Sequence, residues 1–132
     1  MKITPIIISY RSLEKLKNCI KKIGPNIKIV IIENSDDKNI KHEIEKNYQN
    51  CKVILNGSCK GFAKASNIGF KEISSDFAFL LQPDIEIREN QIFEIENLTN
   101  ELNDDFTLAS PISEDLIDFY KNNKIDNFFK KD

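Results

Sequence analysis

The chain has 132 residues, of which 40% are hydrophobic and 30% are charged, and its formal net charge at pH 7 is -2. This length suits one domain with a real hydrophobic core. The near-neutral charge excludes the strongly basic surface with which proteins bind nucleic acid non-specifically, so no nucleic-acid partner is expected.

Strands and helices are predicted to alternate along the whole chain. The expected strands are short and rich in β-branched residues, and the run ITPIIIS at 3–9 is apolar enough to be buried on both faces. The expected helices carry apolar residues at helical spacing and follow capping residues such as Ser12 and either Asp36 or Asp37. In chain order, the elements are strand 3–9, helix 13–23, strand 27–32, helix 38–47, strand 52–55, helix 61–73, strand 76–81, helix 91–102, strand 106–110 and helix 114–122.

This alternation predicts an α/β fold, with right-handed crossovers and a mainly parallel sheet that has helices on both faces. We expect a single domain over residues 1–132. Ligands of such sheets bind beyond the carboxyl ends of the strands. The segments expected at that edge are Ser9 to Arg11, Glu33 to Asp37, Asn56 to Gly61 and Gln82 to Asp84. The carboxylates expected there are Glu33, Asp36, Asp37, Asp84 and Glu86, with Arg11 and Lys60 as counter-charges.

Each of these features also has a simpler structural explanation. Asp36 and Asp37 are most simply helix caps. Pro83 and Asp84 form an ordinary turn dipeptide, and Gly61 can serve a turn. No single one of them specifies a function, so the evidence lies in the set and its order.

Four blocks carry that order: IIISYRSLEKLKNCIKKI, IVIIENSDD, VILNGSCKGFAKASNIGFKEI and FAFLLQPDIEI. They are similar to a first strand with a Thr-Tyr-Asn turn, a Val-Val-Asp-Asn strand end, an Asn-x-Gly-Phe-Ala-x-x-x-Asn-x-Gly helix and a Leu-Asn-Pro-Asp-x-Glu-Ile metal motif. In this the chain resembles the inverting nucleotide-sugar glycosyltransferases of family 2, which have the GT-A fold, and especially their rhamnosyltransferase-like branch. The likeness covers residues 3–112.

The resemblance implies transfer of a sugar from a nucleoside diphosphate to a hydroxyl of a glycan or lipid-linked acceptor, in surface polysaccharide or glycan synthesis. Asp84 matches the family's metal-binding aspartate, which implies a divalent Mn or Mg ion. Glu33 stands where the family has an Asp that accepts a hydrogen bond from the nucleobase. The residues matched to nucleotide-sugar binding are Ser9, Tyr10, Arg11, Glu33, Gly61, Lys64, Asn67 and Gln82.

The sequence departs from the family pattern at several positions. Glu33 is one methylene longer than the family's Asp, and Arg11 replaces the common Asn. Cys59, Lys60 and Glu86 have no role that the sequence assigns. Family members continue into an acceptor-binding half that supplies the general base, and nothing after residue 112 matches it. We therefore expect a truncated donor-binding half, whose catalytic base is unknown and which a partner chain could complete.

Two other classes of protein compete with this interpretation. A non-catalytic nucleotide-sugar-binding or scaffold module would keep the fold without sugar transfer, and the unmatched second half favours it. Retention of Asp84 and of the glycine-containing helix block counts against complete loss of donor binding. A phospho-receiver domain needs an acid at the end of its third strand, where this chain has Leu55 and Asn56.

The cysteines and the apolar runs indicate the compartment. The three cysteines have no regular spacing, which predicts neither a disulfide framework nor a zinc site, and the lone His42 argues against a His-based catalytic triad. We expect reduced thiols and a cytoplasmic location, with the inner face of the membrane as an alternative. No apolar run approaches the ~20 residues that span a bilayer, and no signal peptide is expected.

Overall fold

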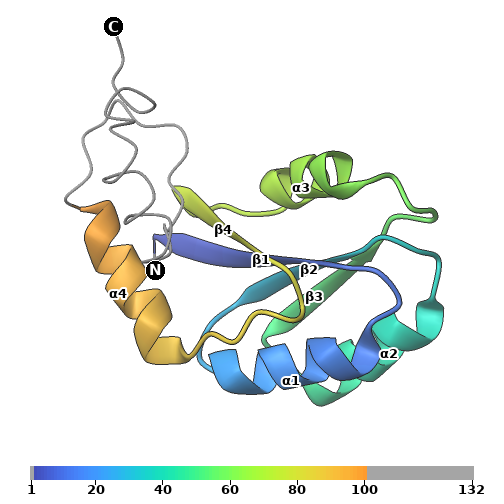
Figure 1. Ribbon diagram of the computed structural model, residues 1–132, viewed down its shortest axis with the longest axis horizontal. Helices are drawn as coiled ribbons and strands as arrows, with labels where there is room; N and C mark the ends of the chain where they lie inside the picture. The colour runs from blue at the N-terminus through green and yellow to red at the C-terminus, as the bar shows by residue number, and fades with distance from the viewer. Residues whose placement is uncertain (1, 101–132) are drawn as a thin grey trace, which may run out of the picture. The chain divides into compact units, whose positions relative to one another are not determined.

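The computed structural model describes residues 2–100, and Met1 and residues 101–132 lie outside the described residues. The expected strand at 106–110 and helix at 114–122 therefore fall outside it. Within the described part, strands and helices alternate (Figure 1). The elements are β1 (Ile3–Ser9), α1 (Leu13–Ile23), β2 (Ile29–Glu33), α2 (Lys38–Asn47), β3 (Cys51–Leu55), α3 (Phe62–Lys71), β4 (Phe77–Leu81) and α4 (Glu89–Thr99).

The described strands form one sheet in the order β3-β2-β1-β4, and all neighbouring pairs are parallel. The predicted parallel α/β architecture is confirmed. In this order the chain moves outward from β1 through β2 to β3, and β4 then returns to the other side of β1. The direction of winding therefore switches between β1 and β4, which is where ligands bind in sheets of this type.

Two apolar clusters lie on the two faces of the sheet, because successive strand side chains point to opposite faces. The larger cluster packs Ile7 and Ile31 of the sheet against α1, α2 and α4, whose buried residues include Ile20, Ile44 and Ile92. The smaller cluster packs other strand residues against α3. Its buried members are Ile6, Ile8, Val30, Ile32 and Ala65. Figure 1 shows α3 on one side of the sheet and α1 and α2 on the other.

Helix α3 approaches the sheet closely at Gly69. A Cβ atom at this position would lie 2.6 Å from Cγ2 of Ile6 and 3.3 Å from its Cδ1. We expect Gly69→Ala to lower the free energy of unfolding by about 1–3 kcal/mol, because the clash outweighs the higher helix propensity of alanine. Urea denaturation would measure this, with the exposed Lys71→Ala as a control that changes stability little. A Gly69→Ala variant as stable as wild type would contradict the close approach.

The helix caps show where local sequence decides the fold. Of the two candidate caps for α2, Asp37 is the one used: its Oδ1 accepts from the N–H of Asn39 at 2.9 Å and of Ile40 at 3.3 Å. Helix α4 begins at Glu89, two residues before its predicted start. The reason is that Oε1 of Gln91 accepts from the N–H of Arg88 at 3.0 Å and so satisfies a donor at the helix start.

Candidate functional site

The polar segments that follow β1, β2 and β3 are joined at the carboxyl edge of the sheet. Ser9 and Glu33 are register partners at the ends of β1 and β2. The N–H of Asn56 then donates to the carbonyl oxygen of Glu33 at 2.9 Å, and the N–H of Gly57 donates to that of Ser35 at 3.0 Å. These contacts bring together three of the four segments that the sequence predicts at this edge.

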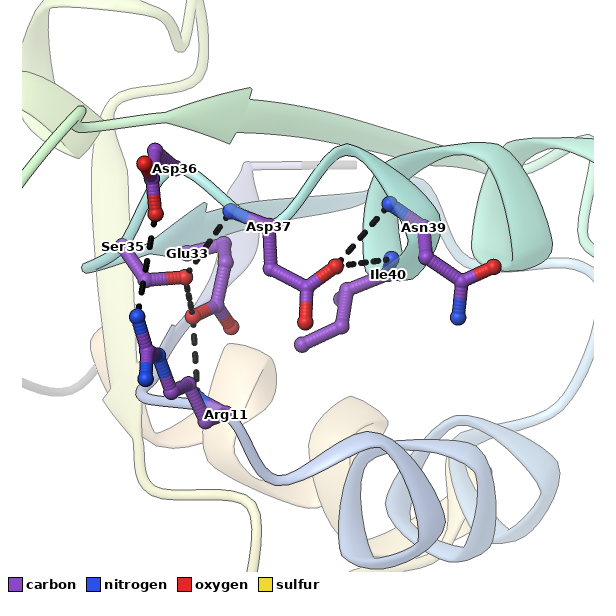
Figure 2. A network of polar contacts seen from close by, with 7 residues as sticks. All are labelled: Arg11, Glu33, Ser35, Asp36, Asp37, Asn39 and Ile40. Carbon is purple, nitrogen blue, oxygen red and sulfur yellow. Dashed lines mark hydrogen bonds and ion pairs between the residues drawn. The ribbon is translucent and has the colours of Figure 1, made fainter.

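Glu33 is the centre of a buried polar network at the end of β2 (Figure 2). Its side chain is 0% exposed. Oε1 accepts from the backbone N–H of Arg11 at 2.9 Å and from the hydroxyl of Ser35 at 2.6 Å. The hydroxyl oxygen of Ser35 in turn accepts from the N–H of Asp37 at 3.2 Å. One carboxylate therefore fixes both the loop before α1 and the loop before α2.

Two polar atoms in this network are buried without a hydrogen-bond partner in the described residues: Oε2 of Glu33 and Oγ of Ser9. The two residues are paired in the parallel ladder, so their side chains point to the same face of the sheet. Buried polar atoms in native proteins nearly always have a partner, and an exception calls for an explanation such as an ordered water, an ion or a ligand. The amino-terminal ends of α1 and α2, which begin nearby, favour negative charge at this position.

Arg11 has an unusual backbone conformation. Its φ of 48° makes it the sole non-glycine residue with positive φ between residues 2 and 100. This left-handed conformation costs about 1–2 kcal/mol for a residue with a Cβ atom. Its guanidinium carbon lies 5.6 Å from the ring centroid of Tyr10, and Nη2 lies 3.8 Å from Oδ1 of Asp36. Since both side chains of the ion pair are exposed, the pair contributes at most about 1 kcal/mol.

Asn34 lies in a segment that the sequence places at this edge, but its structural role there was not predicted. It is buried, and its Oδ1 accepts from Nδ2 of Asn56 at 2.8 Å and from the N–H of Lys60 at 3.0 Å. Its Nδ2 donates to the carbonyl oxygen of Gly61 at 3.5 Å and lies 3.7 Å from Sγ of Cys59. Asn34 thus holds the loop after β3, and places Cys59 and Lys60, for which the sequence had no explanation. The only signal in the sequence was a polar amide directly after a buried strand.

The candidate residues of α3 lie on its exposed side. Gly61 is the N-cap residue, with φ of 80°, which favours glycine. Lys64 and Asn67 are exposed on the first turns of the helix. Among the described residues, their side chains form no hydrogen bond with the segment after β1 or β2. Lys64 and Asn67 therefore belong to the exposed part of the candidate site and are not part of the hydrogen-bond network around Glu33.

The segment after β4 is only partly where the sequence placed it. Gln82 and Asp84 are exposed, and the N–H of Ile85 closes the turn by donating to the carbonyl oxygen of Gln82 at 3.1 Å. The chain then runs back along α1 (Figure 1). Glu86 forms an ion pair with Lys22 in the last turn of α1 at 2.5 Å, and the Lys22 hydrogen bond lowers the pKa of Glu86. The grouping of Glu86 with the edge carboxylates was therefore wrong, because this segment packs against α1 instead of staying at the edge.

Asp84 is the residue at which the sequence predicts a divalent-cation ligand. It is exposed and has no hydrogen bond or ion pair within residues 2–100. No group of three or more His, Cys, Asp or Glu residues suited to a metal occurs in the described part of the chain. A single free carboxylate fits an ion such as Mg²⁺ or Mn²⁺ that takes its other ligands from phosphate oxygens and water.

Two surface hollows lie away from the candidate edge. One, of about 470 Å³, is lined by residues of the α1–β2 and α2–β3 connections, including Gly24 and Tyr48. The other, of about 410 Å³, is polar and is lined by residues at the end of α1 and the start of α4, including Lys22, Glu86 and Arg88. Of the residues that the sequence placed at the candidate edge, only Glu86 lines one of these hollows, the second.

The three thiols differ in exposure and therefore in expected reactivity. Cys19 and Cys51 are buried, and burial raises the pKa of both, that of Cys51 to about 12. Cys59 is exposed. Because the thiolate is the reactive form, we expect one thiol per native chain to react rapidly with Ellman's reagent at pH 8, and the other two only after denaturation. Cys59→Ser should abolish the rapid phase; a rapid phase that survives this substitution would contradict the assignment.

A parallel sheet with switched winding and polar loops at its carboxyl edge is the architecture with which many enzymes bind nucleotides. The family model for glycosyl transferase family 2 matches residues 4–130, and the chain belongs to that family. The chain is also similar to the low-salt glycan biosynthesis hexosyltransferase Agl10 of Haloferax volcanii, with 24% identity over 110 residues. This match covers 80% of the chain and 34% of that protein, so the chain spans about a third of its relative's length.

No helix within residues 2–100 is long and apolar enough to cross a membrane.

Proposed function

We propose that the carboxyl edge of this sheet binds the nucleotide-sugar donor of a family 2 glycosyltransferase. The observation that carries the proposal is the pair of buried, unpartnered polar atoms on Ser9 and Glu33, at the edge where the loops after β1 and β2 meet. A nucleoside offers N–H and O–H groups that such acceptors can bind. Because the chain belongs to glycosyl transferase family 2, we infer that the nucleotide is part of a sugar donor and not the ligand of another nucleotide-binding activity.

The donor is expected to lie across the ends of β2, β1 and β4. Oε2 of Glu33 is proposed to accept from an N–H of the base, and because this atom is buried in the unliganded chain, the loops that cover it would have to open for the contact to form. The exposed ring of Tyr10 covers the base or the ribose. Ser9 and Gln82 contribute hydrogen bonds from either side of that position. Helix α3 and its N-cap contribute Gly61, Lys64 and Asn67 to one side of the proposed donor site. Lys64 faces the negative charge of the donor.

Asp84 is the proposed ligand of a divalent Mn or Mg ion. When bound, such an ion would neutralise the charge that develops on the nucleoside diphosphate as it leaves. The chain presents one carboxylate just after β4: Leu81, the last residue of that strand, is buried, and the turn from Gln82 to Ile85 follows at once. Pro83 stiffens that turn because its ring fixes φ.

The complete reaction is proposed to be inverting transfer of a sugar to a hydroxyl of a glycan or lipid-linked acceptor. The similarity to Agl10, a low-salt glycan biosynthesis hexosyltransferase of Haloferax volcanii, supports this class of reaction. The general base and the acceptor site are assigned to no described residue, and a further segment or a partner chain is proposed to supply them. The proposed location is the cytoplasm, or the inner face of the membrane where a lipid-linked acceptor would lie.

Calorimetric titration with a panel of nucleoside diphosphates tests the proposal. We expect UDP, dTDP or GDP to bind saturably at one site per chain, and more tightly in the presence of MnCl₂ than in EDTA. Adenosine diphosphate is the comparison that reports base selectivity. Absence of binding by every diphosphate in the panel would overturn the donor site and favour a non-catalytic scaffold that keeps the fold.

A further inference from the structure

Arg11 has three features that the proposed function does not explain. Its backbone is in the left-handed conformation, its N–H donates to the buried carboxylate of Glu33, and its guanidinium is held by an ion pair between exposed side chains. We propose that Arg11 binds a phosphate of the donor, and that Asp36 holds the guanidinium in the unliganded chain in place of that phosphate. This inference rests on the proposed nucleotide site. The guanidinium of Arg11 would then balance the negative charge of the donor together with the metal ion proposed at Asp84.

The backbone of Arg11 indicates that the side chain is needed at this position. Glycine adopts φ of 48° freely, and asparagine does so more readily than other residues with a Cβ atom. The Arg11 side chain is 61% exposed and so adds little to the core. Strained residues of this kind are concentrated at ligand-binding positions, where the surrounding structure maintains them.

The surrounding structure here is the Glu33 carboxylate. It accepts the backbone N–H of Arg11 at 2.9 Å from a position that solvent does not reach. The left-handed conformation is therefore fixed by a contact between residues 22 apart in the sequence. On the solvent side, the ring of Tyr10 lies beneath the guanidinium at 5.6 Å. The backbone is anchored while the charged group stays at the surface.

The ion pair with Asp36 is weak enough to be exchanged for a ligand. Its distance of 3.8 Å is too long for a hydrogen bond, and the Asp36 side chain is 76% exposed (Figure 2). A phosphate group is a stronger partner, because the guanidinium can donate two parallel hydrogen bonds to it. Since β1 lies between β2 and β4, a side chain at position 11 can turn from Asp36 on the β2 side toward the ends of β1 and β4.

Binding measurements on three variants test the inference. Each variant is titrated with UDP and with uridine, or with the diphosphate and nucleoside that wild type prefers. Arg11→Asn should weaken diphosphate binding about tenfold and leave nucleoside binding unchanged, because only the phosphate contact is lost. Asp36→Asn should tighten diphosphate binding about two- to fivefold by removing the competing carboxylate. Lys28→Asn, which removes an exposed lysine at the opposite end of β2, should change neither.

The melting temperature provides a second readout. Arg11→Asn should raise Tm by a few degrees because asparagine tolerates the left-handed backbone, which also verifies that the variant folds. Diphosphate binding equal to wild type in Arg11→Asn would overturn the inference while leaving the donor site intact. An equal loss for diphosphate and nucleoside would overturn the phosphate contact in favour of a contact to the base or ribose. Failure of wild type to bind any nucleotide would overturn the donor site itself, and the inference with it.

Discussion

Asp84→Asn is expected to abolish the metal dependence of nucleotide binding. In MnCl₂ the variant should bind a diphosphate about 10–100-fold more weakly than wild type, because an amide replaces the one carboxylate proposed to hold the ion. In EDTA the two proteins should bind equally, since the remaining contacts to the nucleotide are intact. Calorimetry in both buffers measures the difference.

Glu86→Gln is the matched control for this experiment. Glu86 lies two residues further along the same segment, but it pairs with Lys22 of α1 at 2.5 Å and is not at the edge. We expect its metal-dependent binding to equal that of wild type. If Glu86→Gln loses the metal effect and Asp84→Asn keeps it, the proposed ion site lies near the end of α1 and the assignment of Asp84 is wrong.

Glu33→Ala is expected to cause the largest loss of stability among these variants. It removes the acceptor for the Arg11 N–H and the Ser35 hydroxyl at a position that is 0% exposed, and leaves both donors unsatisfied. Together these changes should cost about 2–4 kcal/mol of unfolding free energy. Urea denaturation measures the cost, and a loss below about 1 kcal/mol would contradict the central position of this carboxylate.

Glu33→Gln separates the structural contribution of this side chain from its proposed contact with the base. Its amide oxygen can still accept from Arg11 and Ser35, so the loss of stability should be smaller than in Glu33→Ala. Its NH₂ group, however, donates where Oε2 accepts, so nucleotide binding should fall at least about tenfold. Nucleotide binding equal to wild type in this variant would mean that Glu33 only orders the two loops.

The fold could be predicted from the sequence because its signals are local. The strand at 3–9 and the helices at 13–23 and 38–47 were predicted with their observed bounds. Apolar β-branched runs and helical spacing specify these elements without reference to the rest of the chain. Alternation of strands and helices then leaves little choice but a parallel sheet. The start of α4 was missed because it depends on one side-chain contact, between Gln91 and the N–H of Arg88.

The candidate site could be predicted only as far as topology determines it. A parallel sheet brings the ends of β1, β2 and β3 to one edge, so the positions of Ser9 and Glu33 follow from the strand order. The path of the segment after β4 depends on the burial of Ile87 in the core cluster that includes α1, beside the ion pair of Glu86 with Lys22, and no local pattern encodes these contacts. The left-handed conformation of Arg11 likewise depends on a partner distant in the sequence.

The most direct test of the donor site is an NMR titration of the ¹⁵N-labelled chain with UDP and MgCl₂, or with the diphosphate that binds most tightly. We predict that the largest amide shift changes fall on the segments after β1, β2 and β4, from Ser9 to Arg11, from Glu33 to Asp36 and from Gln82 to Asp84. Shift changes centred on the hollow lined by Lys22, Glu86 and Arg88 would contradict the account, as would a spectrum that saturating nucleotide leaves unchanged.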